Sequence, residues 1–72
     1  MANQNISTRN EDALHEEKIV IAACPGGTKF AYLGTHYIRL SNSHSNINHN
    51  CVRLLDGRLT FLPYQTLVRA WI

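Results

Sequence analysis

The sequence predicts an all-β protein, a small antiparallel barrel or strongly curved sheet of about five strands. Short runs rich in β-branched and aromatic residues are separated by Gly, Pro, Asn and Ser, which is typical of strands joined by turns. Asp56-Gly57 stands between two such runs, and this pair is favoured in tight hairpin turns. At 72 residues the chain has room for one domain of SH3-like size. A core this small is near the limit of stability alone, which leaves a homo-oligomer open.

The N-terminal segment 1–17 is predicted to lie outside a β-domain at 18–72. It is polar and lacks a hydrophobic period, and Asn10 followed by acids is typical of the start of a helix. A helix of about two turns is marginal in water, so we expect a disordered or short-helical leader. The leader carries Arg9 against four carboxylates, a net charge of −3, and residues 18–72 carry six cations against Asp56, a net charge of +5. A basic body is typical of a protein with a polyanionic partner, but it also serves ordinary solubility.

The first strand is expected over Lys18–Cys24, a β-branched apolar run that Pro25-Gly26-Gly27 ends. Strands over 29–33 and 36–40 follow, joined by Gly34-Thr35. With those two residues as the loop, Tyr32 faces Tyr37. Core positions in this pair are predicted at Phe30, Tyr32, Ile38 and Leu40, and more exposed positions at Tyr37 and Arg39.

The segment Ser41–Asn50 is predicted to be a loop, because nine of its ten residues are polar and Ser and Asn favour turns over strand ladders. A loop this long in a small domain is typical of a contact surface or of a mobile segment. It contains His44 and His49 just before Cys51, a set that with Cys24 could ligate zinc. The Cys-x-x-Cys spacing of common zinc modules is absent, so we expect solvated histidines and no metal.

The central hairpin is predicted over Cys51–Phe61, with Asp56-Gly57 as a two-residue type I′ turn. In that register Leu54 faces Leu59. The alternation of side chains divides the hairpin into two faces. The expected core face holds Val52, Leu54, Leu59 and Phe61, and the opposite face holds Arg53, Leu55, Arg58 and Thr60.

A last strand is expected over Thr66–Ile72 after a break at Pro63. Its alternation places Val68, Ala70 and Ile72 on the core side. Leu67 and Trp71 then face the other way, where a turn or another chain must cover them. Trp is common among binding hot spots, and a single Trp is equally expected in the core of a domain this small.

Composition also excludes some classes of protein. No apolar run is long enough to cross a bilayer, and the polar start lacks the layout of a secretory signal. Two cysteines are too few for a secreted disulfide framework, so we expect a cytoplasmic protein with reduced, core-forming thiols. The predicted β-domain has one carboxylate, Asp56, and no cluster suited to acid–base or nucleophilic chemistry, which argues against an enzyme and against a cofactor.

From Phe30 onward the sequence resembles a group of short, uncharacterised proteins of bacteriophages and prophages. The pattern is Phe30-x-Tyr32-x-Gly34-x-x-Tyr37-Ile38-x-Leu40, then Val52-x-Leu54-x-Asp56-Gly57-x-Leu59, then Thr66-x-Val68. The resemblance implies a phage setting, in which small proteins often bind and inhibit a host component, including defence nucleases such as CRISPR effectors.

The sequence therefore favours a non-enzymatic protein that binds a host protein and inhibits it. The predicted binding residues are Tyr37, Arg39, Arg53, Arg58, Arg69 and Trp71. One alternative is a small barrel that binds single-stranded nucleic acid, with arginines on phosphates and Tyr37 or Trp71 stacked on bases. The other is a self-assembling structural protein or one that sequesters a ligand between subunits.

Overall fold

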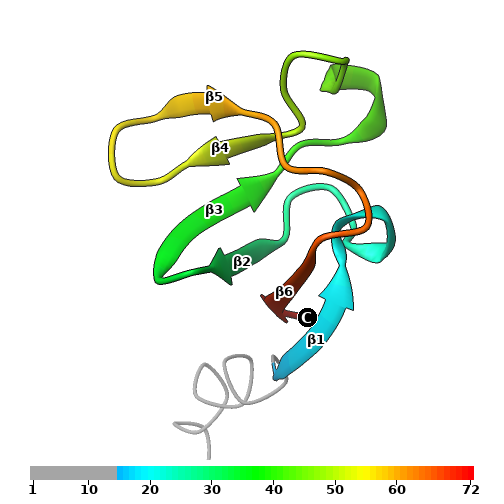
Figure 1. The fold of residues 1–72 in the computed structure, drawn as a ribbon, viewed down its shortest axis with the longest axis vertical. Helices are drawn as coiled ribbons and strands as arrows, with labels where there is room; N and C mark the ends of the chain where they lie inside the picture. Colours follow the sequence, from blue (N-terminus) through cyan, green and yellow to red (C-terminus); the bar gives the residue numbers. More distant parts are fainter. Residues whose placement is uncertain (1–14) are drawn as a thin grey trace, which may run out of the picture.

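The computed structural model describes residues 15–72, and the predictions for residues 1–14 fall outside this range. The described residues form one antiparallel sheet of six strands in the order β1-β6-β2-β3-β4-β5 (Figure 1). The strands are β1 (Glu16–Val20), β2 (Lys29–Tyr32), β3 (Thr35–Arg39), β4 (Cys51–Arg53), β5 (Arg58–Thr60) and β6 (Leu67–Trp71). The all-β prediction is confirmed, with six strands where about five were expected, and the sheet stays open with β1 and β5 as its edges. Over the same range, no helix has the length and apolarity needed to span a membrane.

The first strand begins earlier and ends earlier than predicted. β1 starts at Glu16, so Glu16 and Glu17 belong to the sheet and not to the leader, and it ends at Val20. A 3₁₀ turn, η1 (Ile21–Ala23), replaces the rest of the predicted strand, and the Cys24 N–H donates to the Ile21 carbonyl at 3.0 Å. This turn buries the side chains of both Ile21 and Cys24, which alternation along a straight strand would place on opposite faces.

The β2–β3 hairpin turns at Leu33-Gly34, one residue before the predicted loop. Both residues have positive φ, 51° and 81°, as a type I′ turn requires. Tyr32 consequently pairs with Thr35, and Phe30 pairs with Tyr37. The Phe30 and Tyr37 rings stack with centroids 5.2 Å apart, in the centre of the core.

The burial predicted for β3 is reversed in the structure, and the shifted loop is not the cause, because Tyr37 shares a face with Phe30 in either register. Tyr37 is 7% exposed and Arg39 is 3% exposed, so the expectation that they are surface residues is wrong. Ile38 and Leu40, predicted as core, are only half-buried. Tyr37 pairs with the core residue Phe30, and alternation therefore sends Ile38 to the opposite face of the sheet.

The β4–β5 hairpin has a four-residue loop, Leu54 to Gly57, in place of the predicted two-residue turn. Arg53 pairs with Arg58 and Val52 with Leu59, and Gly57 has a positive φ of 69° whereas Asp56 does not. Asp56 stabilises this loop through its carboxylate, which accepts hydrogen bonds from the Arg58 N–H and from the Arg53 guanidinium.

The predicted core face of this hairpin is also wrong. Leu54, Leu59 and Phe61 are exposed and Val52 is half-buried, whereas Cys51, on the opposite face, is fully buried. The reason is the pairing of Cys51 with Arg39, which places Cys51 over the side of β3 that faces the core.

The core lies on one face of the sheet, closed by η1 and by the segment that runs from β5 to β6 (Figure 1). Its buried members are Ile21, Cys24, Phe30, Tyr37, Cys51, Val68 and Ala70. The alternation predicted for β6 is confirmed at Val68 and Ala70, while Ile72 packs against the core in a half-buried position.

The predicted loop at Ser41–Asn50 is confirmed and is fixed by two buried polar side chains. It contains one short 3₁₀ turn, η2 (Asn42–His44). The Arg39 guanidinium donates to the carbonyls of Ile21, Leu40 and Asn50, at 3.2, 2.7 and 3.3 Å. Asn50 is completely buried, and its amide exchanges hydrogen bonds of 2.8 and 3.0 Å with the backbone of Leu62. These contacts tie the loop to η1 and to the segment after β5.

Candidate binding face

The candidate site is the face of the sheet opposite the core, which we call the open face. Cross-strand pairing and alternation define its members. They are Glu16, Lys18 and Val20 on β1, Leu67, Arg69 and Trp71 on β6, Lys29 and Ala31 on β2, His36 and Ile38 on β3, Val52 on β4 and Leu59 on β5. Most of these side chains are exposed, with Val20, Ile38, Val52 and Trp71 half-buried and Ala31 buried.

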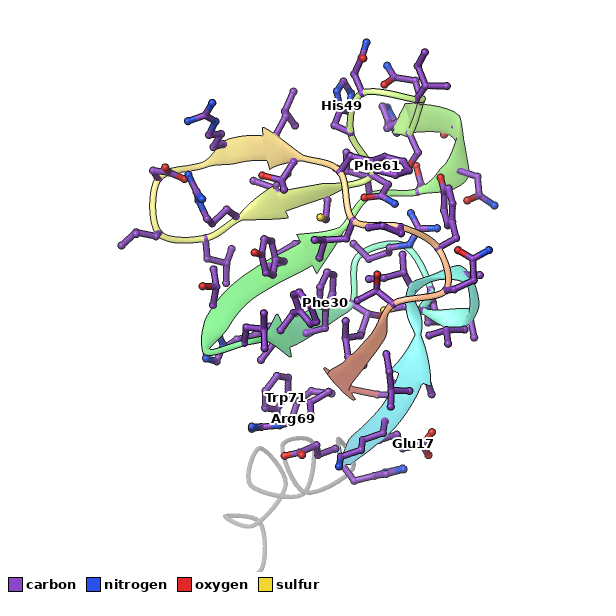
Figure 2. The ribbon with its side chains drawn as sticks, in the orientation of Figure 1. Glu17, Phe30, His49, Phe61, Arg69 and Trp71 are labelled. Atoms are coloured by element: carbon purple, nitrogen blue, oxygen red, sulfur yellow. The ribbon has the colours of Figure 1, made fainter. Side chains whose placement is uncertain are left out.

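One half of the open face is basic and aromatic and is centred on Trp71. His36 stacks on the indole with centroids 5.8 Å apart and an interplanar angle of 13°. The Lys29 Nζ lies 5.8 Å and the Arg69 Cζ 5.6 Å from the centre of the ring, within the range of cation–π attraction. We call these four residues the Trp71 cluster. Arg69 and Trp71 lie together at the end of β6, away from the core residue Phe30 (Figure 2).

Only one of the cations on this half of the face forms an ion pair among the described residues. The Arg69 Nε donates to Glu16 Oε2 at 2.9 Å, an exposed ion pair that in general contributes little to stability. Among the described residues, no carboxylate forms an ion pair with Lys18 or Lys29. This half of the face therefore presents a net positive charge beside an aromatic ring.

The other half of the open face is aliphatic. Ile38 pairs with Val52, and Val52 pairs with Leu59, so the three side chains form one row across β3, β4 and β5. Leu54, at the start of the loop that follows β4, is also exposed. A row of apolar side chains therefore lies next to the cations and the Trp of the other half.

The six predicted binding residues fall into three locations. Arg69 and Trp71 meet on the open face. Tyr37 and Arg39 lie in the core, where neither side chain is accessible to a partner. Arg53 and Arg58 form a cross-strand pair on the side of the β4–β5 hairpin that faces away from the open face.

Arg53 is committed to its own loop. It forms a bidentate pair with Asp56, at 3.1 Å from Nε and 2.8 Å from Nη2. Hydrogen bonding to the Arg53 guanidinium holds the pKa of the Asp56 carboxyl below its ordinary value, and the same bond raises the pKa of Arg53. Among the predicted cations, this pairing leaves Arg58 as an exposed charge on the reverse side of the hairpin.

Sequence reasoning missed Lys29 and His36. The signal was present, because alternation along β2 and β3 puts both residues on the face opposite Phe30 and Tyr37. Finding it required the correct loop at Leu33-Gly34, since only that register brings His36 opposite Ala31 and hence next to β6.

The residues considered for zinc do not converge. In the part of the chain that the structure describes, no three His, Cys, Asp or Glu side chains are grouped as metal ligands. The His44 Nδ1 lies 2.8 Å from the Ser41 hydroxyl, His49 lies beside Asn46, and the Cys51 thiol donates to the Thr60 carbonyl. Burial raises the pKa of Cys51 to about 11, so this thiol is protonated at neutral pH and is a poor nucleophile.

Comparison of the chain with protein-family models, with curated proteins and with solved structures gave no match. The chemistry of the open face is accordingly argued from its own residues. These residues can attract negative charge, contact aromatic or aliphatic groups and exclude water.

Proposed function

We propose that this protein is a non-enzymatic binding protein that engages a protein partner through its open face. The observation that carries the proposal is the continuity of the Trp71 cluster with the aliphatic row of Ile38, Val52 and Leu59, because Lys29 of the cluster pairs with Ile38. Such a surface suits a partner whose contact region is apolar and edged by carboxylates. Trp and Arg near the centre of a contact commonly supply most of its binding free energy.

A protein partner fits this face better than single-stranded nucleic acid does. Nucleic-acid grooves combine cations that follow the phosphates with aromatic rings on which bases stack. Here the Trp71 cluster has one large aromatic ring, and His36 already stacks on it. The aliphatic half of the face has nothing to offer to phosphates or base edges, but it can bury apolar surface of a protein.

The setting of the partner is proposed from the sequence resemblance. The pattern from Phe30 onward resembles phage and prophage proteins, and we place the partner in the cytoplasm of a bacterial host. Host defence proteins, CRISPR effectors among them, are the class to test first, with inhibition as the consequence of binding.

The test is recovery of a partner from host lysate on the tagged full-length protein, with and without nuclease, followed by reconstitution of the pair from purified components. Lys29→Glu is expected to reduce the reconstituted affinity about tenfold or more, because it reverses an exposed charge beside Trp71. Trp71→Ala removes the aromatic centre and should have a larger effect. Arg58→Glu is the matched control, since it makes the same charge change on the other side of the sheet.

The outcomes are distinct. A nuclease-resistant protein that rebinds when purified and is lost with Lys29→Glu but kept with Arg58→Glu supports the proposal. Recovery of nuclease-sensitive material alone, with steep weakening by salt, would instead favour binding of single-stranded nucleic acid. Recovery of only the protein itself, with a concentration-dependent mass, would favour self-assembly.

A further inference from the structure

A hollow of about 220 Å³ lies on the open face, next to the Trp71 cluster. Lys18 and Arg69 stand at it with Ala31, Leu33 and Leu67, and the core residues Tyr32 and Val68 complete its lining. The first three belong to one row across the sheet, because Lys18 pairs with Arg69 and Arg69 pairs with Ala31. Leu67 lies on the same face two residues before Arg69, and Leu33 follows β2 in its turn. The hollow therefore combines two cations with a mostly apolar lining.

The two cations form a pair that costs stability. Like charges directly opposite each other on adjacent strands repel. Lys18 and Arg69 occupy such a position, and the structure gives Glu16 as a partner to Arg69 but gives Lys18 no ion-pair partner among residues 15–72. A carboxylate of a ligand, bound between Lys18 and Arg69, would relieve this repulsion. The two cations are thus complementary in charge to an anionic group.

Two exposed leucines of the lining are also unusual for a solvated surface. Leu33 is 85% exposed and Leu67 is 56% exposed. Leu33 also has a φ of 51°, a left-handed conformation that favours Gly or Asn over a large side chain. A leucine that is strained and exposed contributes little to the fold, so contact with a ligand is a physical reason for its presence.

The size of the hollow selects the kind of ligand. A cavity of about 150 Å³ accepts a benzene ring, whereas pockets for drug-sized molecules measure roughly 300–1,000 Å³. At about 220 Å³ the hollow fits one large side chain and not a nucleotide or a cofactor.

We propose that the hollow is the specificity subsite of the open face, and that it takes a large aliphatic or aromatic side chain of an acidic peptide segment, with the neighbouring carboxylate bound between Lys18 and Arg69. The assignment rests on the proposed function for the identity of the natural partner. Binding of a peptide to the hollow is nevertheless measurable without that partner.

The probe is an N-acetylated, C-amidated peptide, Gly-Ser-Leu-Asp-Ser-Gly, titrated into the full-length ¹⁵N-labelled protein and followed by NMR. We expect the amide signals of Lys18, Ala31, Leu67 and Arg69 to shift, with a Kd on the order of 1 mM. Peptides in which Asn replaces the Asp, or Ala replaces the Leu, should bind about tenfold more weakly. Lys18→Gln should weaken the first peptide by a similar factor, while Arg58→Gln, the matched loss of one exposed cation, should leave it unchanged.

The proposal is overturned if the Asn peptide binds as well as the Asp peptide, if the shifts map elsewhere, or if Lys18→Gln has no effect. It is overturned also if no shift occurs up to roughly 10 mM peptide, since binding that weak carries no specificity. Failure of the proposed function gives a different result. In that case the peptide still binds the hollow, but no purified protein partner loses affinity with Lys29→Glu.

Discussion

Replacing Asn50 with Ala should remove a large share of the stability of this domain. Asn50 is completely buried, and its side chain both donates to the Leu62 carbonyl and accepts from the Leu62 N–H. The loss of two hydrogen bonds, at about 1 kcal/mol each, adds to the cost of the space left by the amide. We expect a total loss of about 2–4 kcal/mol, against a whole-domain stability of roughly 3–10 kcal/mol.

The assay is equilibrium unfolding in guanidinium, followed by the fluorescence of Trp71, the only Trp in the chain. In a thermal scan the same loss should lower Tm by about 10–25 °C. Asn48→Ala is the control, because Asn48 lies in the same loop with an exposed side chain, and it should change stability by less than about 0.5 kcal/mol.

Asn50→Asp tests the hydrogen bond to the Leu62 carbonyl separately. It preserves the shape of the side chain and the acceptor for the Leu62 N–H, but it places a second oxygen against the Leu62 carbonyl. This variant should be at least as destabilised as Asn50→Ala. If Asn50→Ala unfolds like Asn48→Ala, or if Asn50→Asp matches the wild-type protein, the amide does not fix the loop and the reasoning is refuted.

Three further predictions concern single positions. Burial raises the pKa of Cys51 from 9.0 to about 11, so between these pH values the thiol ionises only in the unfolded chain. The free energy of unfolding, measured by urea titration at a series of pH values, should therefore fall as the pH rises from 9 to about 11. Cys51→Ala should make this fall with pH smaller. Gly26→Ala should cost about 1–3 kcal/mol, because its Cβ would lie 2.7 Å from the backbone Cα of Ser41, and an unchanged midpoint of unfolding would contradict this. Leu33→Asn should raise stability by about 0.5–1 kcal/mol through relief of its left-handed strain, and a fall in Tm would count against the strain.

The turn positions were harder to predict than the strands themselves. Asp56-Gly57 has the composition of a type I′ turn, yet it lies in a four-residue loop. The Asp56 carboxylate stabilises this longer loop by accepting hydrogen bonds from the Arg53 guanidinium and from the Arg58 N–H. Leu33-Gly34 forms the type I′ turn although Leu is disfavoured there. Local propensity for a turn is a small free energy, and pairing of Phe30 with Tyr37 in the core outweighs it.

The open face was predicted only in part. Leu67, Arg69 and Trp71 are visible from alternation along one strand, as are Val68 and Ala70 behind them. Lys29 and His36 come from other strands, and their approach to Trp71 depends on β6 pairing with β2 across a long stretch of sequence. The burial of Arg39 was missed because an arginine is normally exposed unless several acceptors surround it. Here the acceptors come from Ile21 in η1 and from Ser45 and Asn50 in the Ser41–Asn50 loop.

Local sequence patterns were enough to predict the all-β class, the approximate places of most strands, the polar loop at Ser41–Asn50 and the alternation of β6. These follow from local chemistry, since β-branched runs, turn residues and a period of two act over a few residues. The tertiary arrangement sets which face of β3 and β4 is buried, how Arg39 and Asn50 fix the loop from inside, and how Lys29, His36 and Arg69 come together around Trp71. These features depend on pairing between residues distant in the chain, such as Phe30 with Ala70, and no local pattern encodes such contacts.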